Sequence, residues 1–351
     1  MPSAADWVTS LSPWPAEFGL GRMRALLKSL GGPQRDYPSI HVVGTNGKST
    51  ATVTIEAYLL REGLHVGAYL SPHVRGWSER IRVDGDEVDF ERAVERVRAR
   101  AEDAGATQFE VLTAAALVEF AESDVDVAVV EAGLGGRHDA TNVLDAPVVL
   151  LTNVALEHTD VLGDTRAAIA HEKLAVVRPG ATVILPDEEF APLVPAAHVV
   201  LGRAREAAAA FLGHPPENGV EVTLPGRLEV RSDNEIWDGA HNPDGLAWAL
   251  PRLPGGRYTV VASILRDKDV DRMLGQLTSV ATRLVATRSS NPRALPADEL
   301  AARARRRFAS VEAVEDPEAA LALARETPPV LVTGSLYLLA DLAAREEQRV
   351  K

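Results

Sequence analysis

Along most of the chain, short apolar runs alternate with longer segments in which apolar residues recur every three or four positions. The short runs, rich in Val, Ile and Leu, predict buried strands, and the longer segments have the spacing of one helix face. The predicted strands lie in residues 39–44, 65–73, 125–133, 146–154, 181–186, 257–265, 281–289 and 328–335. The predicted helices lie in residues 50–63, 110–123, 165–180, 269–280, 297–309 and 336–348. This alternation indicates an α/β fold with mainly parallel sheets covered on both faces.

The pattern changes once, near "GHPPENG" at residues 213–219, where Pro, Gly and Asn are typical of a linker. A second series of strands and helices follows this segment. We therefore predict two α/β domains, residues 1–225 and 226–351. No internal repeat of fixed period is visible.

Charge and composition narrow the classes of function. The chain has 351 residues and a formal net charge of −13, whereas a nucleic-acid-binding protein usually carries a basic surface. Its densest basic run, "RARRRFAS" at residues 303–310, fits a solvated helix face. The absence of cysteine excludes disulfides and thiolate chemistry. We see no signal peptide and no apolar run of membrane-spanning length, so we expect a cytoplasmic protein with no nucleic-acid or membrane partner.

The stretch "HVVGTNGKST" at residues 41–50 places a Gly-containing turn between a predicted strand and a predicted helix. A phosphate-binding loop needs Gly for close backbone approach, a Lys for the phosphate charge and a hydroxyl for Mg²⁺. Gly44, Gly47, Lys48 and Ser49 supply these groups. The match is a variant, because Val42 stands where the usual signature has its first Gly. The alternative is a plain β–α turn with a solvated Lys48.

Three further candidates lie at or just beyond the ends of predicted strands: Ser71, Glu131 and His158. In open α/β sheets, ligands bind beyond the carboxyl ends of the strands. A Ser, a Glu and a His gathered there beside a phosphate loop could hold Mg²⁺. Each also has a structural interpretation, as a turn cap, a surface carboxylate and a loop histidine respectively.

In the second half, "WDGAHNPDG" at residues 237–245 brings Asp, His and Asn into one turn. Asn242 followed by Pro243 predicts a helix N-cap with proline in the first turn. That assignment leaves Asp238 and His241 unexplained, and both suit a ribose or phosphate contact.

Taken in chain order, the motifs resemble those of folylpolyglutamate synthase/dihydrofolate synthase, an ATP-dependent amide ligase of the Mur ligase superfamily. The matching segments include "GTNGK", "SPHVRGWSERIRV", "FEVLTAAALVEFA", "EAGLGGRHDATNV", "LEHTDVLGDT", "HEKLAVVRPG", "PGRLEV", "DGAHNP", "DKD" and "TGSLYL". The resemblance covers nearly the whole chain. It implies a P-loop-containing, Mur-ligase-like ATP-binding domain with a parallel sheet, followed by a smaller Rossmann-like domain.

The resemblance also implies roles for individual residues. ATP would be bound by Asn46, Gly47, Lys48, Ser49, Arg227 and Asp238, and Mg²⁺ by Ser71, Glu131 and His158. The pterin end of a substrate would contact Thr107, Gln108, Phe109, Glu110 and His138. Lys173 falls where the family has a carbamylated lysine, so Lys48, Lys173 and His158 are the expected catalytic residues.

The chain departs from the family pattern at three places. Ser49 stands where the family loop usually has Gly, although Ser49 and Thr50 keep a hydroxyl there. Gln108 replaces the usual aromatic of the pterin segment. The segment between Pro179 and Arg227 is shortened and lacks the Gly-x-His-Gln-x-x-Asn-Ala motif; Glu206 occupies the position of its nucleotide-binding Asn.

The activity that this resemblance implies is ligation of L-glutamate to the carboxylate of dihydropteroate, of a folate, or of both, through an acyl phosphate. ATP is the co-substrate and Mg²⁺ the cofactor, and we expect a monomer. One alternative is a Mur-like ligase acting on a different carboxylate, which the shortened segment suggests. Another is a protein that binds ATP or folate without turnover, which the missing Asn suggests; the presence of Lys48, Glu131, His158 and Lys173 argues against it.

Overall fold

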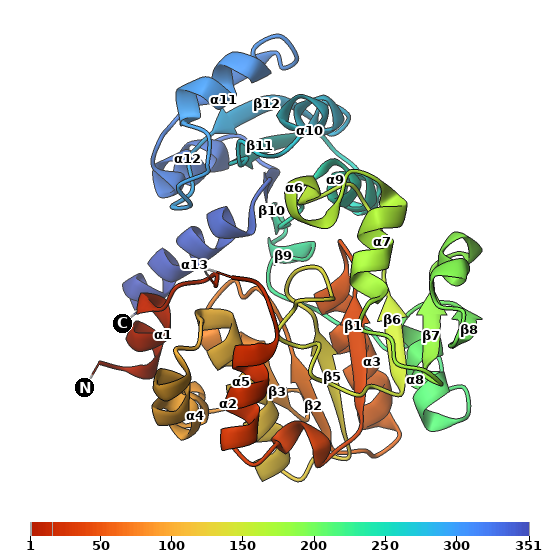
Figure 1. The fold of residues 1–351 in the computed structure, drawn as a ribbon. Coiled ribbons are helices and arrows are strands. Elements are labelled where there is room, and N and C mark those ends of the chain that lie inside the picture. The colour runs from red at the N-terminus through yellow and green to blue at the C-terminus, as the bar shows by residue number, and fades with distance from the viewer. Residues whose placement is uncertain (1, 16, 351) are drawn as a thin grey trace. The chain divides into compact units, whose positions relative to one another are not determined.

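The computed structural model describes the backbone of residues 2–15 and 17–350, and the side chains of these residues except 159, 160 and 347–350. By internal packing the chain forms two compact units. The first runs up to Pro72 and then over Trp77–Val222; the second comprises His73–Gly76 and the chain from Thr223 onward. Each unit holds one sheet, so the predicted α/β class is confirmed (Figure 1). The functional boundary expected at residue 225/226 stays a prediction, since these units are defined by packing.

The sheet of the first unit has eight strands with β1 near its centre. In sheet order they are β4 (Asp86–Glu87), β3 (Ile81–Val83), β2 (Val66–Tyr69), β5 (Val127–Glu131), β1 (Ser39–Val43), β6 (Val148–Leu151), β7 (Thr182–Leu185) and β8 (His198–Leu201). The six strands from β2 to β8 are parallel, and β3 and β4 are antiparallel at one edge. The carboxyl ends of β2, β5, β1 and β6 therefore meet at the same edge of the sheet.

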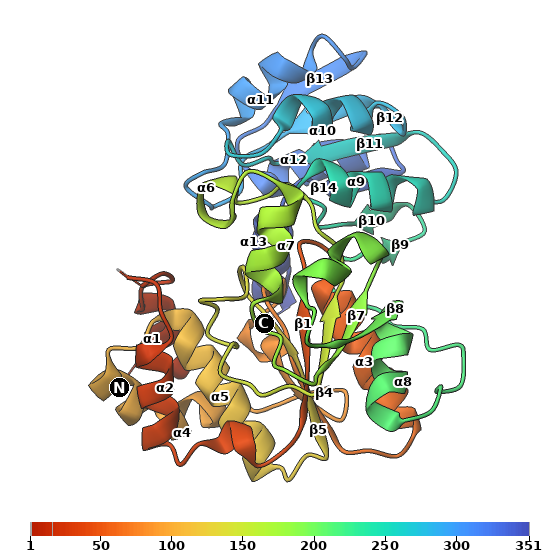
Figure 2. The ribbon, with the colours of Figure 1, turned by 45° about the vertical axis from the view of Figure 1, so that its right-hand side comes forward.

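Helices cover both faces of this sheet (Figure 2). One face carries α3 (Lys48–Arg61) and α8 (Ala204–Leu212), which bury Ile40 and Val42 of β1. The remaining helices of the unit are α1 (Ala4–Ser10), α2 (Gly21–Ser29), α4 (Phe90–Ala104), α5 (Gln108–Glu122), α6 (Thr159–Leu162) and α7 (Arg166–Leu174). Val43 packs in the opposite core with α7. The face with Ile40 and Val42 is apolar, whereas the opposite face carries the buried polar residues Ser39 and His41 beside Val43.

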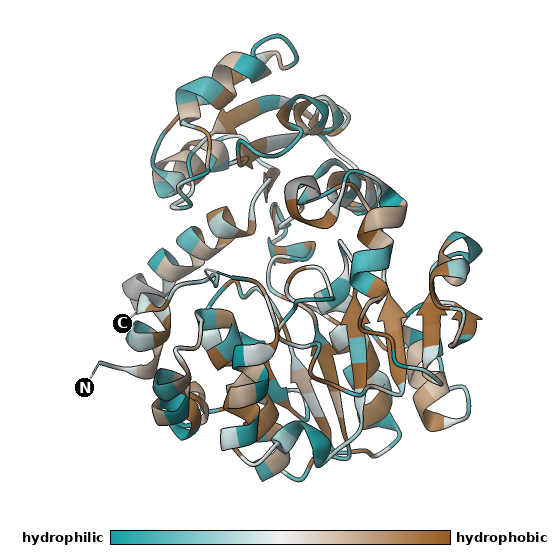
Figure 3. Ribbon diagram, viewed as in Figure 1, coloured by the Kyte–Doolittle hydropathy of each residue, from teal (hydrophilic) through white to brown (hydrophobic). Residues whose placement is uncertain are grey.

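The sheet of the second unit is also parallel except at one edge. In sheet order its strands are β13 (Ser310–Ala313), β12 (Ala281–Ala286), β11 (Tyr258–Ala262), β14 (Val330–Thr333), β10 (Glu235–Trp237) and β9 (Glu229–Ser232). Its helices are α9 (Pro243–Ala249), α10 (Val270–Leu277), α11 (Ala297–Ala304), α12 (Pro317–Arg325) and α13 (Leu336–Val350). Much of the strand ribbon is brown, hence apolar, in Figure 3, most evidently in the first unit's sheet. Val74 packs into the second unit's core beside Trp237, although it follows β2 in sequence.

The helix expected over residues 165–180 is shorter than predicted and ends at Leu174. Pro179 disfavours helical backbone at Arg178, and the Val176 carbonyl accepts a hydrogen bond from Arg178 Nη1 at 3.1 Å. Among the described residues, no helix is both long and apolar enough to cross a membrane.

Candidate active site

The loop between β1 and α3 is held by residues that follow β6. Thr45 N donates to the carbonyl of Asn153 at 3.0 Å, and Asn46 N donates to Asn153 Oδ1 at 2.8 Å. Thr152 Oγ1 donates to the Asn46 carbonyl at 2.7 Å. A Cβ on Gly44 would lie 1.9 Å from Thr152 Oγ1, and the φ of +149° there favours glycine. The loop is therefore fixed before any ligand binds.

Glu131, the last residue of β5, lies among the candidates that follow β1 and β2. Its carboxylate is 1% exposed, and it accepts from Ser49 Oγ at 3.2 Å and from Ser71 N at 3.1 Å. Lys48 Nζ lies 4.0 Å from Glu131 Oε1 and donates to the Thr45 carbonyl at 3.3 Å. The structure thus brings Lys48, Ser49, Ser71 and Glu131 together at the carboxyl edge of the sheet.

Lys173 of α7 reaches the same loop from the other side. Its side chain is buried, which rules out the exposed helical lysine as an alternative, and its Nζ donates to the Gly44 carbonyl at 2.9 Å. Burial, together with the positive charge of Lys48, lowers the pKa of Lys173 to about 7. Gly136 makes this approach possible, because a Cβ there would lie 2.3 Å from the Lys173 carbonyl oxygen. At neutral pH a large fraction of Lys173 is the neutral, nucleophilic amine.

His158 lies at the start of α6, after β6. Its φ is +52°, an uncommon conformation for a residue with a side chain, and its carbonyl accepts from the amides of Val161 and Leu162, both at 2.9 Å. The backbone therefore fixes where His158 enters the short helix. Its role as a metal ligand stays a prediction.

The predicted substrate segment forms the start of α5. Thr107 and Glu110 make a capping box, in which Thr107 N donates to Glu110 Oε2 at 2.8 Å. Glu110 also pairs with Arg22 at 2.7 Å, and Gln108 Nε2 donates to the Val8 carbonyl at 2.9 Å. These polar groups already have partners within the fold, so a local structural role accounts for Thr107, Gln108 and Glu110.

Phe109 is the member of this segment that adjoins the loops of the site. Its ring lies 6.0 Å from that of Tyr69, and a Cβ on Gly133 would come within 2.5 Å of the Phe109 ring. Tyr69 and Gly133 each lie two residues from a candidate ligand, Ser71 and Glu131 respectively. His138 is exposed in a turn after this loop.

In the second unit, Asp238 follows β10 and organises the turn that precedes α9. It accepts from Leu228 N and Ala240 N, both at 2.9 Å. Burial raises the pKa of Asp238 although the charge of Arg227 opposes this. Asn242 caps α9 through Gly245 N at 2.8 Å, as the sequence predicts. Arg227 and Asp238 are thus close together, and both stay predicted nucleotide contacts.

Sequence reasoning missed Asn153 and Asp139. Asn153 holds the phosphate loop, and its position near the carboxyl end of the strand predicted at 146–154 was the available signal. Asp139 is buried, and burial raises its pKa even though it accepts from Leu134 N at 2.8 Å and Thr141 N at 3.0 Å. Asp139 stabilises the turn after β5.

The donor set fits a magnesium ion that is shared with a phosphate. Among the residues that the structure describes, no three His, Cys, Asp or Glu side chains form a metal-binding group. Mg²⁺ in nucleotide sites is commonly bound by only one or two carboxylates, with water and phosphate oxygens completing its shell. Glu131, flanked by the Ser49 hydroxyl and Ser71, provides such a partial site.

Comparisons with known proteins identify both halves of the chain. The Mur ligase middle domain matches residues 42–195, and the Mur ligase glutamate ligase domain matches residues 226–336. The dihydrofolate synthase/folylpolyglutamate synthase of Mycobacterium tuberculosis is 34% identical, over 84% of this chain and 80% of that protein. The folylpolyglutamate synthase of Lacticaseibacillus casei is 32% identical, over 90% of this chain and 92% of that protein.

Solved structures agree over the whole length. Escherichia coli FolC in complex with DHPP and ADP has a TM-score of 0.87 at 27% identity, covering 100% of this chain and 99% of that one. A bifunctional folylpolyglutamate synthase/dihydrofolate synthase with Mn, AMPPNP and L-glutamate bound has a TM-score of 0.86 at 28% identity, covering 99% of this chain and 98% of that one. The chain therefore belongs to the folylpolyglutamate synthase/dihydrofolate synthase family of the Mur ligases.

Proposed function

We propose that this protein is an ATP-dependent ligase that joins L-glutamate to the carboxylate of a pterin or folate through an acyl phosphate. The observation that carries the proposal is the convergence of Lys48, Lys173 and Glu131 on one preformed glycine loop. Two cations and one carboxylate around a preformed glycine loop suit a triphosphate with its metal ion. The relatives that match over nearly the whole chain bind ADP, AMPPNP, DHPP and L-glutamate, which supports the same substrate classes here.

The chemistry has two steps. An oxygen of the acceptor carboxylate attacks the γ-phosphorus of ATP, the bond from that phosphorus to the β–γ bridging oxygen breaks, and ADP leaves. The neutral amine of glutamate then attacks the acyl carbon, the carbon–oxygen bond to phosphate breaks, and the amine proton leaves with the phosphate. Phosphorylation is needed because oxide is a very poor leaving group.

The residues of this chain position and neutralise the charges that develop. Lys48 lies on the loop where the β- and γ-phosphates would bind, and its ammonium stabilises charge on the transferred group. Ser49, Ser71 and Glu131, with His158, would hold Mg²⁺, which when bound neutralises the phosphate charge. Arg227 and Asp238 are the proposed nucleotide contacts of the second unit.

Lys173 is proposed to be carbamylated. Only a neutral amine reacts with CO₂, and the pKa of about 7 makes that form available near neutral pH. The product is an anion with two oxygens, which replaces a second buried cation beside Lys48. Lys173→Ala should then lose activity that a small added carboxylate partly restores, and Lys173→Arg should stay inactive. Full activity in the Arg variant would show that only a cation is needed.

The decisive assay measures phosphate release from ATP and L-glutamate with dihydropteroate, with tetrahydrofolate, or with neither. Release that depends on one of the two acceptors supports the proposal and identifies the acceptor. Tight ATP binding without acceptor-dependent release would instead favour a non-catalytic binder. Release that only an unrelated carboxylate stimulates would indicate a Mur-like ligase of different specificity.

A further inference from the structure

A polar cavity lies in the first unit, at the opposite edge of the sheet from the phosphate loop. Its volume is about 740 Å³, and its wall includes Ser39 at the start of β1, the loop before β6, and Arg178 before β7. Val43, at the other end of β1, leads into the phosphate loop. The two ends of this five-residue strand are about 13 Å apart. The cavity is therefore separate from the candidate active site.

Four cations and one carboxylate line this cavity. Arg24, Lys28, Arg35 and Arg178 face a single Asp145. Within the part of the chain that the structure describes, no carboxylate lies within ion-pair distance of Arg24, Lys28 or Arg35. Arg24 and Lys28 are four residues apart on α2, where two like charges repel and destabilise a helix. An anion in the cavity would remove this repulsion.

Arg178 forms a fixed wall of the cavity. Its Nη2 donates to the Asn142 carbonyl at 3.1 Å and to Asn142 Oδ1 at 2.9 Å, and its Nε pairs with Asp145 at 3.2 Å. These bonds hold the guanidinium in place, and Asp145 offsets its charge. The three remaining cations give the cavity a net positive charge.

A buried hydrogen-bond acceptor in the wall favours a ligand that also carries a hydrogen-bond donor. Gln34 also lines the cavity, and its Oε1 is buried without a hydrogen-bond donor among the described residues. A buried acceptor left without a donor destabilises the fold. A ligand that carries an N–H group besides its negative charges would satisfy it, whereas inorganic polyphosphate has no such donor.

We propose that this cavity binds a short γ-linked glutamyl chain, a ligand with regularly spaced carboxylates and amide N–H groups. The inference rests on the proposed function, because that activity makes γ-glutamyl products. Successive α-carboxylates of such a chain are about 6 Å apart when extended, since each repeat adds two carbons to the 3.6 Å of an ordinary residue. Arg24 and Lys28 have a similar spacing, roughly 5–6 Å between their Cβ atoms. One carboxylate can therefore lie at each cation while an amide reaches Gln34.

Calorimetric titration with tri-γ-glutamate tests the proposal, with magnesium and a non-hydrolysable ATP analogue present to fill the phosphate loop. The double variant Arg24→Gln/Lys28→Gln should bind about tenfold more weakly at low salt, because two exposed cations are lost. The matched control is Arg305→Gln/Arg306→Gln, which removes the same charge from exposed positions of the second unit. The control should bind like the parent protein, and circular dichroism checks that both variants are folded.

Three results would overturn the assignment: no binding by the parent protein, equal binding by the cavity variant, or tripolyphosphate binding as tightly as tri-γ-glutamate. Equal binding would place the ligand at the active site. Acceptor-dependent phosphate release, measured on the same samples, should be unchanged in both variants. Failure of the proposed function shows as absent release in the parent protein, so the two failures are distinguishable.

Discussion

The phosphate-loop region of the first unit and the Glu235 network of the second bury charge in opposite ways. In the first, Lys173 is 4% exposed, its Nζ donates to a backbone carbonyl, and the nearby Lys48 helps to lower its pKa to about 7. In the second, Glu235 is also buried, but it accepts two hydrogen bonds from Arg325, at 2.6 and 2.8 Å, and one from Trp237 Nε1 at 2.8 Å. The charge of Lys173 is thus poorly compensated, whereas that of Glu235 is fully compensated.

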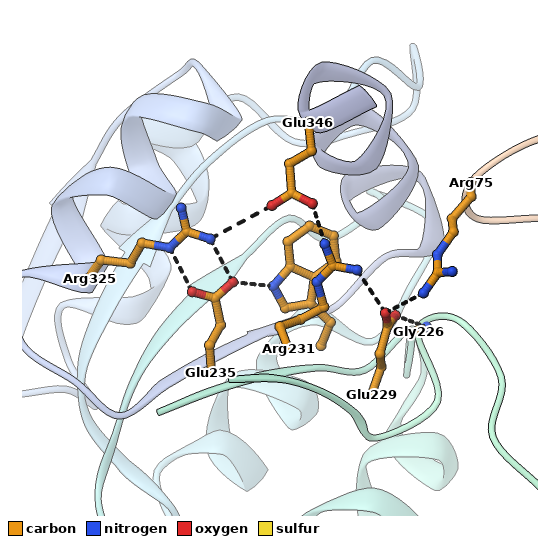
Figure 4. A network of polar contacts seen from close by, with 8 residues as sticks. Arg75, Gly226, Glu229, Arg231, Glu235, Arg325 and Glu346 are labelled. Atoms are coloured by element: carbon orange, nitrogen blue, oxygen red, sulfur yellow. Dashed lines mark hydrogen bonds and ion pairs between the residues drawn. The ribbon is translucent and has the colours of Figure 1, made fainter. Parts of the chain in front are cut away.

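The network around Glu235 extends through the second unit (Figure 4). Glu346 pairs with both Arg325 and Arg231, and Arg231 lies over the Trp237 ring with 4.6 Å to its centroid. Burial alone would raise the pKa of Glu229, but hydrogen bonds from Arg231, from the Gly226 amide and from Arg75 outweigh it and lower that pKa. Each buried carboxylate here has an arginine beside it.

The difference shows which of the two regions has its buried charge compensated before a ligand binds. A buried charge without a counter-charge destabilises a fold unless something else supplies that counter-charge. Lys173 on α7 and Lys48 at the start of α3 both reach the loop where a triphosphate is proposed to bind. The satisfied network of the second unit needs no ligand, which is typical of a structural role.

The largest effect should come from Lys48→Ala. Turnover should fall by at least ~10³-fold, because the ammonium stabilises charge on the transferred phosphoryl group. Lys48 is partly exposed at the first position of α3, so circular dichroism should not change. The substitution should also raise the pKa of Lys173, since the charge of Lys48 helps to lower it. Phosphate-release kinetics measure the first effect.

Arg61→Ala at the other end of α3 is the matched control and should keep full turnover. Near-normal turnover in folded Lys48→Ala would refute the phosphate-loop assignment. The charges buried near the loop would then have no demonstrated function to set against the structural network of the second unit.

The second effect concerns pH. The lowered pKa of Lys173 means that the unfolded chain binds more protons than the folded one between pH 7 and about 10.5. The contribution of Lys173 to stability is therefore smallest below pH 7 and increases by about 1.4 kcal/mol for each pH unit above it. Lys173→Met should lack this increase. Urea unfolding in CO₂-free buffer measures the free energy of unfolding of both proteins at pH 6 and pH 9. Relative to the parent protein, the variant should be less stable at pH 9 than at pH 6.

A parallel pH dependence of the two proteins would show that Lys173 keeps an ordinary pKa. Adding bicarbonate then sharpens the test, because carbamylation of the parent protein should change its unfolding curve and leave that of Lys173→Met unchanged.

Much of the fold could be predicted from the sequence, because buried parallel strands are long apolar runs. The strands at 39–44 and 146–154 were found for that reason. The edge strands β4, β8, β9 and β13, and β3 beside one edge, were missed, since they are short or polar. The amphipathic helix α4 was also missed, and the inclusion of His73–Gly76 in the second unit depends on packing that no local pattern encodes.

Less of the candidate site than of the fold could be predicted from the sequence. Strand ends indicated that Ser71 and Glu131 would meet, because parallel strands share an edge, and the structure brings both to the phosphate loop. The Thr-x-x-Glu spacing of Thr107 and Glu110 is the local signature of a capping box, but it was not used. No local pattern showed that Asn153 holds the glycine loop, because that contact joins separate elements and only the fold defines it.

A smaller effect is expected from Glu235→Gln in the second unit. The amide can still accept from Trp237, but the bidentate pairing with Arg325 becomes weaker. We expect a loss of roughly 1–2 kcal/mol in the free energy of unfolding of this unit, since Arg325 is half exposed and regains water. Hydrogen exchange of the Glu229–Trp237 peptide measures it locally.

The matched control is Glu299→Gln, which removes an exposed pair with Arg303 on α11 and should cost no more than ~0.5 kcal/mol. Equal losses of stability in the two variants would mean that the buried Glu235–Arg325 pair contributes no more than an exposed pair. The contrast between the two regions would then have no energetic basis.

The smallest effect should come from Arg75→Gln. Arg75 Nη2 lies 2.8 Å from Glu229 Oε1, but the Arg75 side chain is 51% exposed, and Glu229 keeps its bonds to Arg231 at 2.8 Å and to the Gly226 amide at 2.8 Å. Exposed pairs of this kind contribute about 0–1 kcal/mol, so exchange of the Glu229–Trp237 peptide should change by less than tenfold. A larger change would show that this arginine, from a loop after β2, secures the network, and that the second unit's stability depends on a segment inserted from the first half of the chain.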